Sequence, residues 1–452
     1  MSEPFVNAAE LTAHGLVELR RSVLEVAGAG LRACDPGPAT ETAVARSASG
    51  VTVGEHEYPL GDGARVIVVG AGKATLAIAA ALERKLGERL DGGAIAVRDG
   101  DQTVALELIE VLVADHPLPS ERSLGAARRL DAIAADAGPG DLVLALFTGG
   151  SSALACLPPD GVSFAEKRRL HQLLLSSGAP IAEVNTVRKH VSAIKGGRLA
   201  ARAAPATLVN LVVSDVAGDV LETLTDPSVE DTSTPAEAIA VLRSRGLWEE
   251  LPETVRAHLL SPAAESPALE REPHSQLLVN GQIACEAMRR AAQSLGLEAR
   301  VVSTSLSGEA SRVGAELAEI AVRCRADGAP ALLIGCGGES TVSLGREDPF
   351  GLGGPNQEAA LALAAALPGD APVAACLIDT DGSDGGTEAA GAIVDGRTAA
   401  RAKAAGVELA AALAAHRSGE ALEALGERVL TGPTHTNVND LFAIAVGGGR
   451  GR

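Results

Sequence analysis

The sequence has few aromatic residues and no excess of positive charge. Aromatic residues make up 2% of the 452 residues, and the formal net charge is −19 at pH 7. Few aromatic rings weaken the case for a platform on which nucleic-acid bases stack. The negative charge argues against a surface for nucleic acid or acidic membranes, because both need a basic footprint. We therefore expect neither nucleic acid nor a membrane among the partners.

Long apolar runs and paired cysteines are also missing. No segment offers about 18 uninterrupted apolar residues, and residues 1–5 lack the basic region and apolar core of a secretory signal. The six cysteines are widely scattered, without the spacing of a zinc site or the density of a disulfide framework. We expect a soluble cytoplasmic protein whose cysteines are mostly buried thiols.

The sequence does contain short apolar strands that alternate with helices. Apolar residues at helical spacing predict one long amphipathic helix over residues 7–33. Further strands are predicted at residues 65–69, 108–113, 142–147, 207–213, 331–334, 374–378 and 441–446. This alternation is typical of a doubly wound, mainly parallel sheet, whose ligand crevice is formed by loops at the carboxyl ends of the strands.

The length favours more than one domain. Between residues 225 and 273 the chain is rich in Pro, Glu and Ser and has few strand signals, and the strand and helix pattern restarts at Gln276. We therefore expect an α/β protein of two domains. A larger Rossmann-like domain is predicted over residues 1–273 and a smaller α/β domain over residues 274–452.

The first candidate site is the turn Gly70-Ala71-Gly72-Lys73-Ala74. It follows a predicted strand and precedes a helix, so its backbone N–H groups and Lys73 can meet a phosphate. It is not a P-loop, because Ile67 stands where the first glycine is required and Ala74 replaces the Ser or Thr that binds magnesium. A tight turn with a solvated lysine is the alternative.

A second turn, Thr148-Gly149-Gly150-Ser151-Ser152, predicts an anion-binding nest at a helix start. Serine-nucleophile chemistry is disfavoured there because the Gly-x-Ser-x-Gly elbow is absent. Cations are then concentrated in residues 185–198, among them Arg188 and Lys195. They form either a solvated helix face or the positive charge that an anionic substrate needs.

Acidic side chains follow other predicted strands. Asp215 follows the strand at 207–213, where a carboxylate can bind Mg²⁺, take a hydroxyl proton or cap a helix. Asp379, Asp381 and Asp384 lie in the densest acidic loop, which lacks the Glu of an EF-hand and therefore suits Mg²⁺ with a nucleotide better than calcium. A turn rich in Asp and Gly for conformational reasons is the alternative.

A last loop, residues 432–440, places hydroxyl, amide and carboxylate groups after a short apolar stretch, as anion and Mg²⁺ sites require. His435 lies on this loop, and His116 follows the strand at 108–113. Neither histidine has a Cys or Asp at metal-ligand spacing.

Together these motifs resemble the glycerate 2-kinase family, in which a kinase-like N-terminal domain is joined to a smaller C-terminal domain named for its MOFRL motif. The resemblance runs from the N-terminal helix to about Val446. It is carried by the segments Gly70–Ala74, His116-Pro117, Gly149–Leu154, Asn185–Gly197, Ser214–Val216, Gly337–Glu339, Gly353–Glu358, Thr380–Gly391 and Gly432–Asp440.

The resemblance implies an ATP- and Mg²⁺-dependent transfer of the γ-phosphoryl group to the 2-hydroxyl of D-glycerate or a related small hydroxy acid, in a cleft between two α/β domains. It leaves the oligomeric state open, with a homodimer as one arrangement. Lys73 matches the family's catalytic lysine, and we expect Asp215 to act as the base or a metal contact. The expected nucleotide or phosphate contacts are Gly70, Gly72, Gly149, Gly150, Ser151, Ser152, Thr434 and Asn437; the substrate contacts are His116, Arg188, Lys195, Asn356, Glu358 and His435; and the metal contacts are Asp379, Asp381 and Asp384.

The sequence departs from the family's motifs in four ligand loops. Pro355 stands where the family has an arginine, Asp226 and His435 stand where it has glycines, and Ser151 replaces a third glycine. Losing a cation and adding an anion weakens the binding of a small carboxylate, so we expect altered acceptor choice or lost activity. The candidates to restore the positive charge are Arg188, Arg198 and Arg346.

Two other functions stay open. An NAD(P)-dependent hydroxypyruvate reductase is one, because the turn at 70–74 is similar to a dinucleotide fingerprint. Its third glycine is Thr75, however, and Asp99 is the nearest approach to an acid that would bind ribose. The other is a ligand-binding protein that keeps the kinase frame without turnover, which Pro355 favours and Lys73 disfavours.

Overall fold

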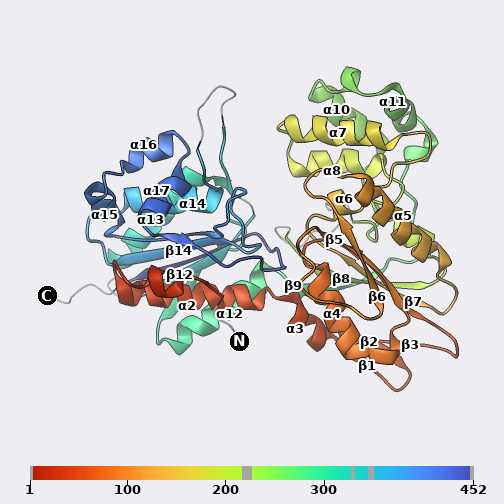
Figure 1. Cartoon of the computed structure of the whole chain (residues 1–452), viewed down its shortest axis with the longest axis horizontal. Coiled ribbons are helices and arrows are strands. Elements are labelled where there is room, and N and C mark those ends of the chain that lie inside the picture. The colour runs from red at the N-terminus through yellow and green to blue at the C-terminus, as the bar shows by residue number, and fades with distance from the viewer. Residues whose placement is uncertain (1–3, 216–225, 327–330, 339, 345–350, 448–452) are drawn as a thin grey trace. The chain divides into compact units, whose positions relative to one another are not determined.

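The computed structural model describes residues 4–215, 226–326, 331–338, 340–344 and 351–447 (Figure 1). The chain forms two compact units. The first, called here the N-terminal unit, comprises Pro36–Ser214 and Val220–Leu278, and the second, the C-terminal unit, comprises Met1–Asp35, Asp215–Asp219 and Val279–Arg452. The change of unit after Leu278 lies close to the predicted boundary at 273, whereas the first 35 residues pack with the C-terminal part of the chain.

The N-terminal unit is built on a six-stranded sheet with the strand order β6-β5-β4-β7-β8-β9. The pairs β4–β5, β4–β7, β5–β6 and β7–β8 are parallel, which confirms the predicted parallel sheet. Its strands are β4 (Val66–Ala71), β5 (Gly92–Arg98), β6 (Ile109–Ala114), β7 (Leu142–Phe147), β8 (Thr207–Val213) and β9 (His274–Val279).

Helices α4 (Thr75–Leu86), α5 (Glu121–Asp136) and α9 (Arg198–Ala203) accompany this sheet. The central strands β4 and β7 are apolar and buried along their whole length. On one side of the sheet, Ile67 and Val69 of β4 share a core with Leu130 of α5 and Leu199 of α9. A capping box at Ser120 starts α5. Helices α5 and α9 therefore pack on the same apolar core of this sheet.

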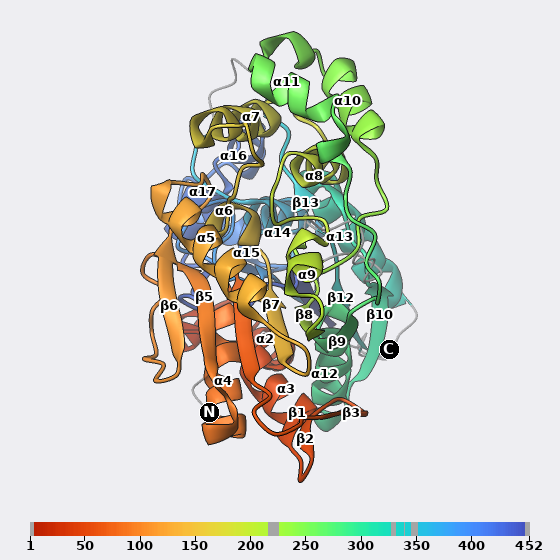
Figure 2. The same ribbon diagram turned by 90° about the vertical axis from the view of Figure 1, so that its right-hand side faces the viewer.

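A separate apolar core unites α7 (Phe164–Ser176), α8 (Ile181–His190), α10 (Pro235–Ser244) and α11 (Glu253–Leu259). Figures 1 and 2 show these helices gathered at one end of the N-terminal unit. The remaining elements of the unit are α3 (Pro36–Ala43), β1 (Val44–Arg46), β2 (Gly50–Val53), β3 (His56–Pro59), α6 (Ser151–Leu154) and the 3₁₀ turns Gly87–Arg89, Trp248–Glu250 and Pro262–Ala264.

The C-terminal unit has a mixed six-stranded sheet with the order β10-β12-β17-β14-β15-β16. Strands β10 and β12 are parallel and the other pairs are antiparallel. The strands are β10 (Glu298–Ser303), β12 (Ala331–Cys336), β14 (Val373–Asp379), β15 (Gly391–Asp395), β16 (Arg428–Val429) and β17 (Asp440–Val446), with the pair β11 (Gly308–Glu309) and β13 (Ser340–Thr341) beside them in sequence.

Helices cover both faces of this sheet. One face packs on α13 (Ala310–Ala326), α14 (Pro355–Ala366) and α17 (Ser418–Ala424). The other packs on α2 (Val17–Ala33) and α12 (Gly281–Ser294), which Figure 1 shows side by side. The remaining helices of the unit are α1 (Ala8–Leu11), α15 (Thr398–Ala404) and α16 (Leu409–Ala414). Within the described residues, no helix has the length and apolar character needed to cross a membrane.

The prediction of one long helix over residues 7–33 was wrong, because α1 and α2 are separated at residues 12–16. Gly15 has φ 72°, and a Cβ there would lie 2.0 Å from Asp395 Oδ2. Next to this turn, buried Arg20 pairs with Asp395 at 2.5 Å and with Glu427 at 2.6 Å. The break in the helix therefore lets the chain approach the carboxylates that anchor α2 to the C-terminal sheet.

Candidate active site

Two glycines shape the turn that holds Lys73 at the start of α4. Gly72 has φ 143°, and a Cβ there would lie 2.0 Å from Thr148 Oγ1. A Cβ on Gly70 would lie 2.5 Å from the carbonyl oxygen of Leu146. Glycine is therefore required at both positions, since any larger residue would push β4 away from β7.

The turn after β7 is bonded directly to the Lys73 turn. The N–H of Lys73 donates to the carbonyl oxygen of Gly149 at 2.9 Å, and the N–H of Ala74 donates to Thr148 Oγ1 at 3.2 Å. The Thr148 hydroxyl also lies 3.3 Å from that of Thr75. Thr148, which sequence reasoning did not single out as a site residue, thus joins the two turns.

Gly150 lies between Lys73 and His116. It has φ 88°, and a Cβ on it would lie 3.3 Å from His116 Cδ2 and 3.6 Å from Lys73 Cγ. Lys73 and His116 are half-buried, as are Ser151 and Ser152 at the start of α6. The structure therefore gathers six of the predicted residues, namely Gly70, Gly72, Lys73, His116, Gly149 and Gly150.

Arg188 and Lys195 belong to a second group of charges in the same unit. Lys195 is fully buried, and burial lowers its pKa to about 7, a change that the nearby Asp226 carboxylate opposes. Burial also lowers the pKa of Arg188, on α8. Asp226 Oδ1 accepts hydrogen bonds from the N–H and the hydroxyl of Ser228 at 2.7 and 2.5 Å. Asp226 is thus a buried carboxylate beside a buried lysine.

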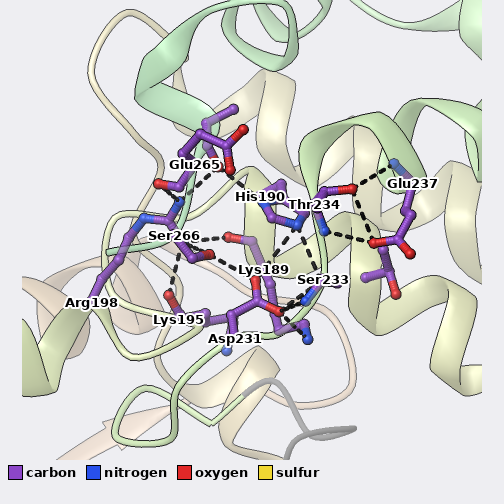
Figure 3. Close-up of polar contacts among 12 residues, drawn as sticks. Lys189, His190, Lys195, Arg198, Asp231, Ser233, Thr234, Glu237, Glu265 and Ser266 are labelled. Carbon is purple, nitrogen blue, oxygen red and sulfur yellow. Dashed lines mark hydrogen bonds and ion pairs between the residues drawn. The ribbon is translucent and has the colours of Figure 1, made fainter. Parts of the chain in front are cut away.

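Neighbouring cations of this segment have structural partners (Figure 3). Lys189 pairs with Asp231 at 2.5 Å. Arg198 donates to the carbonyl oxygens of Lys189 and Lys195, both at 3.0 Å. It also donates to the carbonyl oxygens of Ala264 and Glu265. Its guanidinium is therefore occupied by main-chain oxygens, which weakens its candidacy as a replacement cation. Arg346 lies outside the described residues.

In the C-terminal unit, Asp384 caps α14. Its Oδ1 accepts the N–H of Asn356 at 3.0 Å, and its Oδ2 accepts the N–H of Gln357 at 2.8 Å. The Asn356 amide also donates to Asp440 Oδ1 at 2.6 Å, so it links Asp384 to the first residue of β17. Pro355 occupies the first position of α14, where a proline loses no helical hydrogen bond.

Burial shifts the acids of this loop. Burial raises the pKa of Asp384 to about 6, although the hydrogen bonds from α14 oppose the rise. Burial and the charge of Asp381 raise the pKa of Asp379 well above its usual range, and Asp440 stands opposite Asp379 in the β14–β17 pair. The Asp381 N–H donates to Asp379 Oδ1 at 2.8 Å. In the part of the chain that the structure describes, no group of three or more His, Cys, Asp or Glu side chains is arranged to hold a metal ion.

The loop at 432–440 is bonded to the acidic loop and to Asp215, which belongs to the same unit. The Thr434 hydroxyl donates to the carbonyl oxygen of Thr380 at 2.5 Å, and the N–H of Asn439 donates to Asn437 Oδ1 at 3.0 Å. The Asn439 amide donates to the carbonyl oxygen of Asp215. His435 has φ 56°, a conformation that suits the glycine of the family better than a histidine.

The side-chain partner of Glu358 is His416, which lies in none of these loops. Glu358 is buried on α14 and lies 3.1 Å from His416 Nδ1. Sequence reasoning also missed Lys167 and His171, which accompany Arg188 and Lys195. Their spacing of four residues in a helix puts them on one face, and this signal could have found them.

Comparison with known proteins matches both parts of the chain. Residues 22–260 match the domain of unknown function DUF4147, and residues 332–440 match the MOFRL family. The glycerate 2-kinase of Pyrococcus horikoshii is 38% identical over 446 residues, which cover 96% of this chain and 99% of that protein. An Agrobacterium vitis protein with the provisional name hydroxypyruvate reductase is 44% identical, over 85% of this chain and 87% of that protein.

A solved structure agrees with the fold. The crystal structure of glycerate kinase from Thermotoga maritima superposes with a TM-score of 0.81 at 36% identity, and the match covers 94% of this chain and 98% of that chain. The chain therefore belongs to the glycerate kinase family, with a DUF4147 domain followed by a MOFRL domain.

Proposed function

We propose that the protein is an ATP-dependent kinase that transfers the γ-phosphoryl group to the 2-hydroxyl of D-glycerate or a related small hydroxy acid. The observation that carries the proposal is the junction of the turns after β4 and β7, where Lys73 and His116 flank Gly150. A cation, an imidazole and two glycine turns at the ends of parallel strands suit a transferring phosphate.

Phosphoryl transfer depends mainly on positioning and on neutralising charge, so little covalent chemistry is required of the protein. The Lys73 ammonium would stabilise the negative charge on the oxygens of the γ-phosphoryl group during its transfer. Backbone N–H groups at the start of α4 and around Gly149 would orient the phosphates. Asp215 at the end of β8 is the proposed base or metal contact, because a carboxylate there can take the proton of an acceptor hydroxyl.

Mg²⁺, when bound with ATP, would neutralise phosphate charge. Its usual sites combine one or two carboxylates with phosphate oxygens and waters, so the lack of a three-carboxylate group among the described residues does not count against it. Asp379 and Asp381 suit that role better than Asp384, because both Asp384 oxygens are committed to α14. We therefore assign the cation to the first two aspartates.

The proposed acceptors include small hydroxy acids other than D-glycerate, because uncharged Pro355 stands where the family has an arginine. D-glycerate is the first candidate, as the named activity of the Pyrococcus horikoshii relative supports it. A homodimer and a cytoplasmic location remain predictions of the sequence.

A nicotinamide-dependent reductase is the second candidate, favoured by the provisional name of the Agrobacterium vitis relative. Two contacts disfavour it. Thr75, at the third fingerprint position, is buried and donates its hydroxyl to the carbonyl oxygen of Leu146 at 3.2 Å. The carboxylate of Asp99, which would have to bind ribose, lies 3.1 Å from Arg122.

The test is a product assay with purified protein, ATP and Mg²⁺ over a panel of hydroxy acids. We expect ADP release that depends on D-glycerate or a close analogue, and a loss of about 100-fold or more in kcat for Lys73→Met. Lys85→Met, which removes an exposed lysine of α4, is the matched control and should keep full activity. No phosphorylated product from any acceptor, or oxidation of NAD(P)H with hydroxypyruvate, would contradict the proposal.

A further inference from the structure

Four basic side chains form a buried group in the N-terminal unit. Lys167 and His171 come from α7, Arg188 comes from α8, and Lys195 precedes α9. The first two and Lys195 are 1, 2 and 0% exposed. Each lies close enough to the others that the charges of Lys167 and Arg188 act on both His171 and Lys195. We call these four residues the basic cluster.

The basic cluster lacks the partners that buried cations normally have. Among the residues that the structure describes, Lys195 Nζ, His171 Nε2 and Arg188 Nε have no hydrogen-bond partner. Lys167 is the exception, because its ammonium donates to the carbonyl oxygen of Val191. The Asp226 carboxylate opposes the lowering of the Lys195 pKa, but its Oδ1 accepts a hydrogen bond from the Ser228 hydroxyl.

The next residues of the same segment show what a structural cation looks like. Lys189 has its carboxylate, Asp231, at 2.5 Å, and Arg198 has several carbonyl oxygens (Figure 3). A buried, unpaired polar group lowers stability, and a buried charge without a counter-charge lowers it more. Among the described residues, no hydrogen bond accounts for the buried polar atoms of His171, Arg188 and Lys195 named above.

A small oxyanion would satisfy these groups. Carboxylate and phosphate oxygens accept charge-assisted hydrogen bonds from ammonium, guanidinium and imidazolium donors. Arg188 is the one member of the cluster that is partly exposed. Cys156, two residues beyond the end of α6, faces the cluster, and α6 itself starts at the Gly149-Gly150 turn beside Lys73. The basic cluster is thus connected through a single short helix to the candidate active site.

We propose that Lys167, His171, Arg188 and Lys195 form a binding site for a small oxyanion, either the carboxylate of the hydroxy-acid acceptor or free phosphate. The first source rests on the proposed kinase function, whereas the second does not. Binding should be coupled to proton uptake. Burial lowers the pKa of Lys195 to about 7, and the charges of Lys167 and Arg188 lower it further, whereas Cys156 and Asp226 oppose the change. A bound anion would raise the pKa of Lys195 again, so that the lysine takes up a proton.

The experiment is calorimetric titration of the whole chain, without ATP, using D-glycerate, inorganic phosphate and uncharged glycerol. We expect one of the two anions to bind, glycerol not to bind, and a proton to be taken up at about pH 8. Lys195→Met should lower the affinity for the anion by about 30-fold or more, and Lys85→Met should leave the affinity unchanged. Arg188→Gln, at the partly covered edge of the cluster, is the second variant should Lys195→Met fail to fold by circular dichroism.

The two anions distinguish the source. Lys195-dependent binding of D-glycerate identifies an acceptor site, and binding of phosphate alone identifies a separate anion site; either supports the proposal. Absence of binding for both anions, or equal affinities in wild type, Lys195→Met and Arg188→Gln, overturns it. Phosphorylation of D-glycerate with an unchanged KM in Lys195→Met would overturn the acceptor assignment and leave the kinase function standing. Lys195-dependent binding of D-glycerate without phosphorylation would contradict the kinase function and leave an anion site at Lys195.

Discussion

Lys195→Met should make the protein more stable at neutral pH. The wild-type side chain is 0% exposed, and burial lowers its pKa to about 7 from the usual 10.5. Methionine keeps a similar chain length and removes the ammonium group. A buried cation whose Nζ has no hydrogen-bond partner among the described residues is thereby replaced by an apolar chain.

The sign and size of the effect follow from proton linkage. Because the folded-state pKa lies below that of the unfolded chain, the unfolded state binds more protons between about pH 7 and 10.5. Wild-type stability therefore rises with pH across this window. The difference between the two pKa values corresponds to about 5 kcal/mol, and replacements of buried ionic groups have stabilised proteins by about 1–4 kcal/mol. We expect Lys195→Met to unfold with a free energy about 2–4 kcal/mol above wild type at neutral pH, with an excess that shrinks toward alkaline pH.

Urea unfolding followed by the fluorescence of Trp248 measures this effect. The chain has a single tryptophan, and it lies in the same unit as Lys195. Urea carries no charge, so it leaves the electrostatics intact. Buffers without phosphate keep the basic cluster free of its proposed ligand, and added phosphate or D-glycerate should then stabilise wild type but not Lys195→Met.

The matched control is Lys85→Met, which should leave both the stability and its pH dependence unchanged. If Lys195→Met is no more stable than wild type, or its difference from wild type does not vary with pH, the account of Lys195 as a buried cation that Asp226 compensates only in part is wrong. The Asp226 carboxylate would then be a sufficient counter-charge for Lys195.

Three further substitutions test the site and its supports. Gly150→Ala should cost about 1–2 kcal/mol of stability through its left-handed backbone and lower kcat about tenfold or more by displacing His116, which a Cβ would approach to 3.3 Å. Gly161→Ala, with φ 82° and no atom within 4 Å of its Cβ, should cost similar stability and no activity; equal activity in both variants would count against the Gly150 junction. Arg20→Met should lower the free energy of urea unfolding by about 3–5 kcal/mol, because it leaves Asp395 and Glu427 with Arg401 alone, while exposed Arg21→Met should change it little. Asp384→Ala should cost about 2–4 kcal/mol even without Mg²⁺, since it leaves buried donors of Asn356 and Gln357 unpaired; a loss seen only in the presence of Mg²⁺ would restore the metal role.

The features that could be predicted from the sequence depend on neighbouring residues. The β4 turn needs a run of apolar β-branched residues, two glycines and a helix start, and all of these lie within residues 66–75. The meeting of Lys73, His116 and Gly150 follows from the rule that loops at the carboxyl ends of parallel strands lie together. Strands β4, β6, β7, β8, β12, β14 and β17 were placed for the same local reason.

The features that could not be predicted depend on contacts between distant segments. The break at Gly15 is required by Asp395, which lies in β15. The sequence shows that Asp384 is acidic and lies on a loop, but only the fold shows that both of its oxygens accept hydrogen bonds from N–H groups of α14. Lys195 is similar, because burial in the fold and the charge of Lys167, on the distant helix α7, lower its pKa.

The central claim is that the protein phosphorylates the 2-hydroxyl of a small hydroxy acid with ATP. Phosphorus NMR of a reaction with D-glycerate, ATP and Mg²⁺ tests it most directly, because the coupling of the new resonance to its neighbouring protons separates a phosphate on the secondary hydroxyl from one on the primary hydroxyl. We predict a 2-phosphate that accumulates in step with ADP in the wild type and is lost in Lys73→Met. A spectrum in which ATP stays intact, or in which the new phosphate sits on the 3-hydroxyl, would contradict the account.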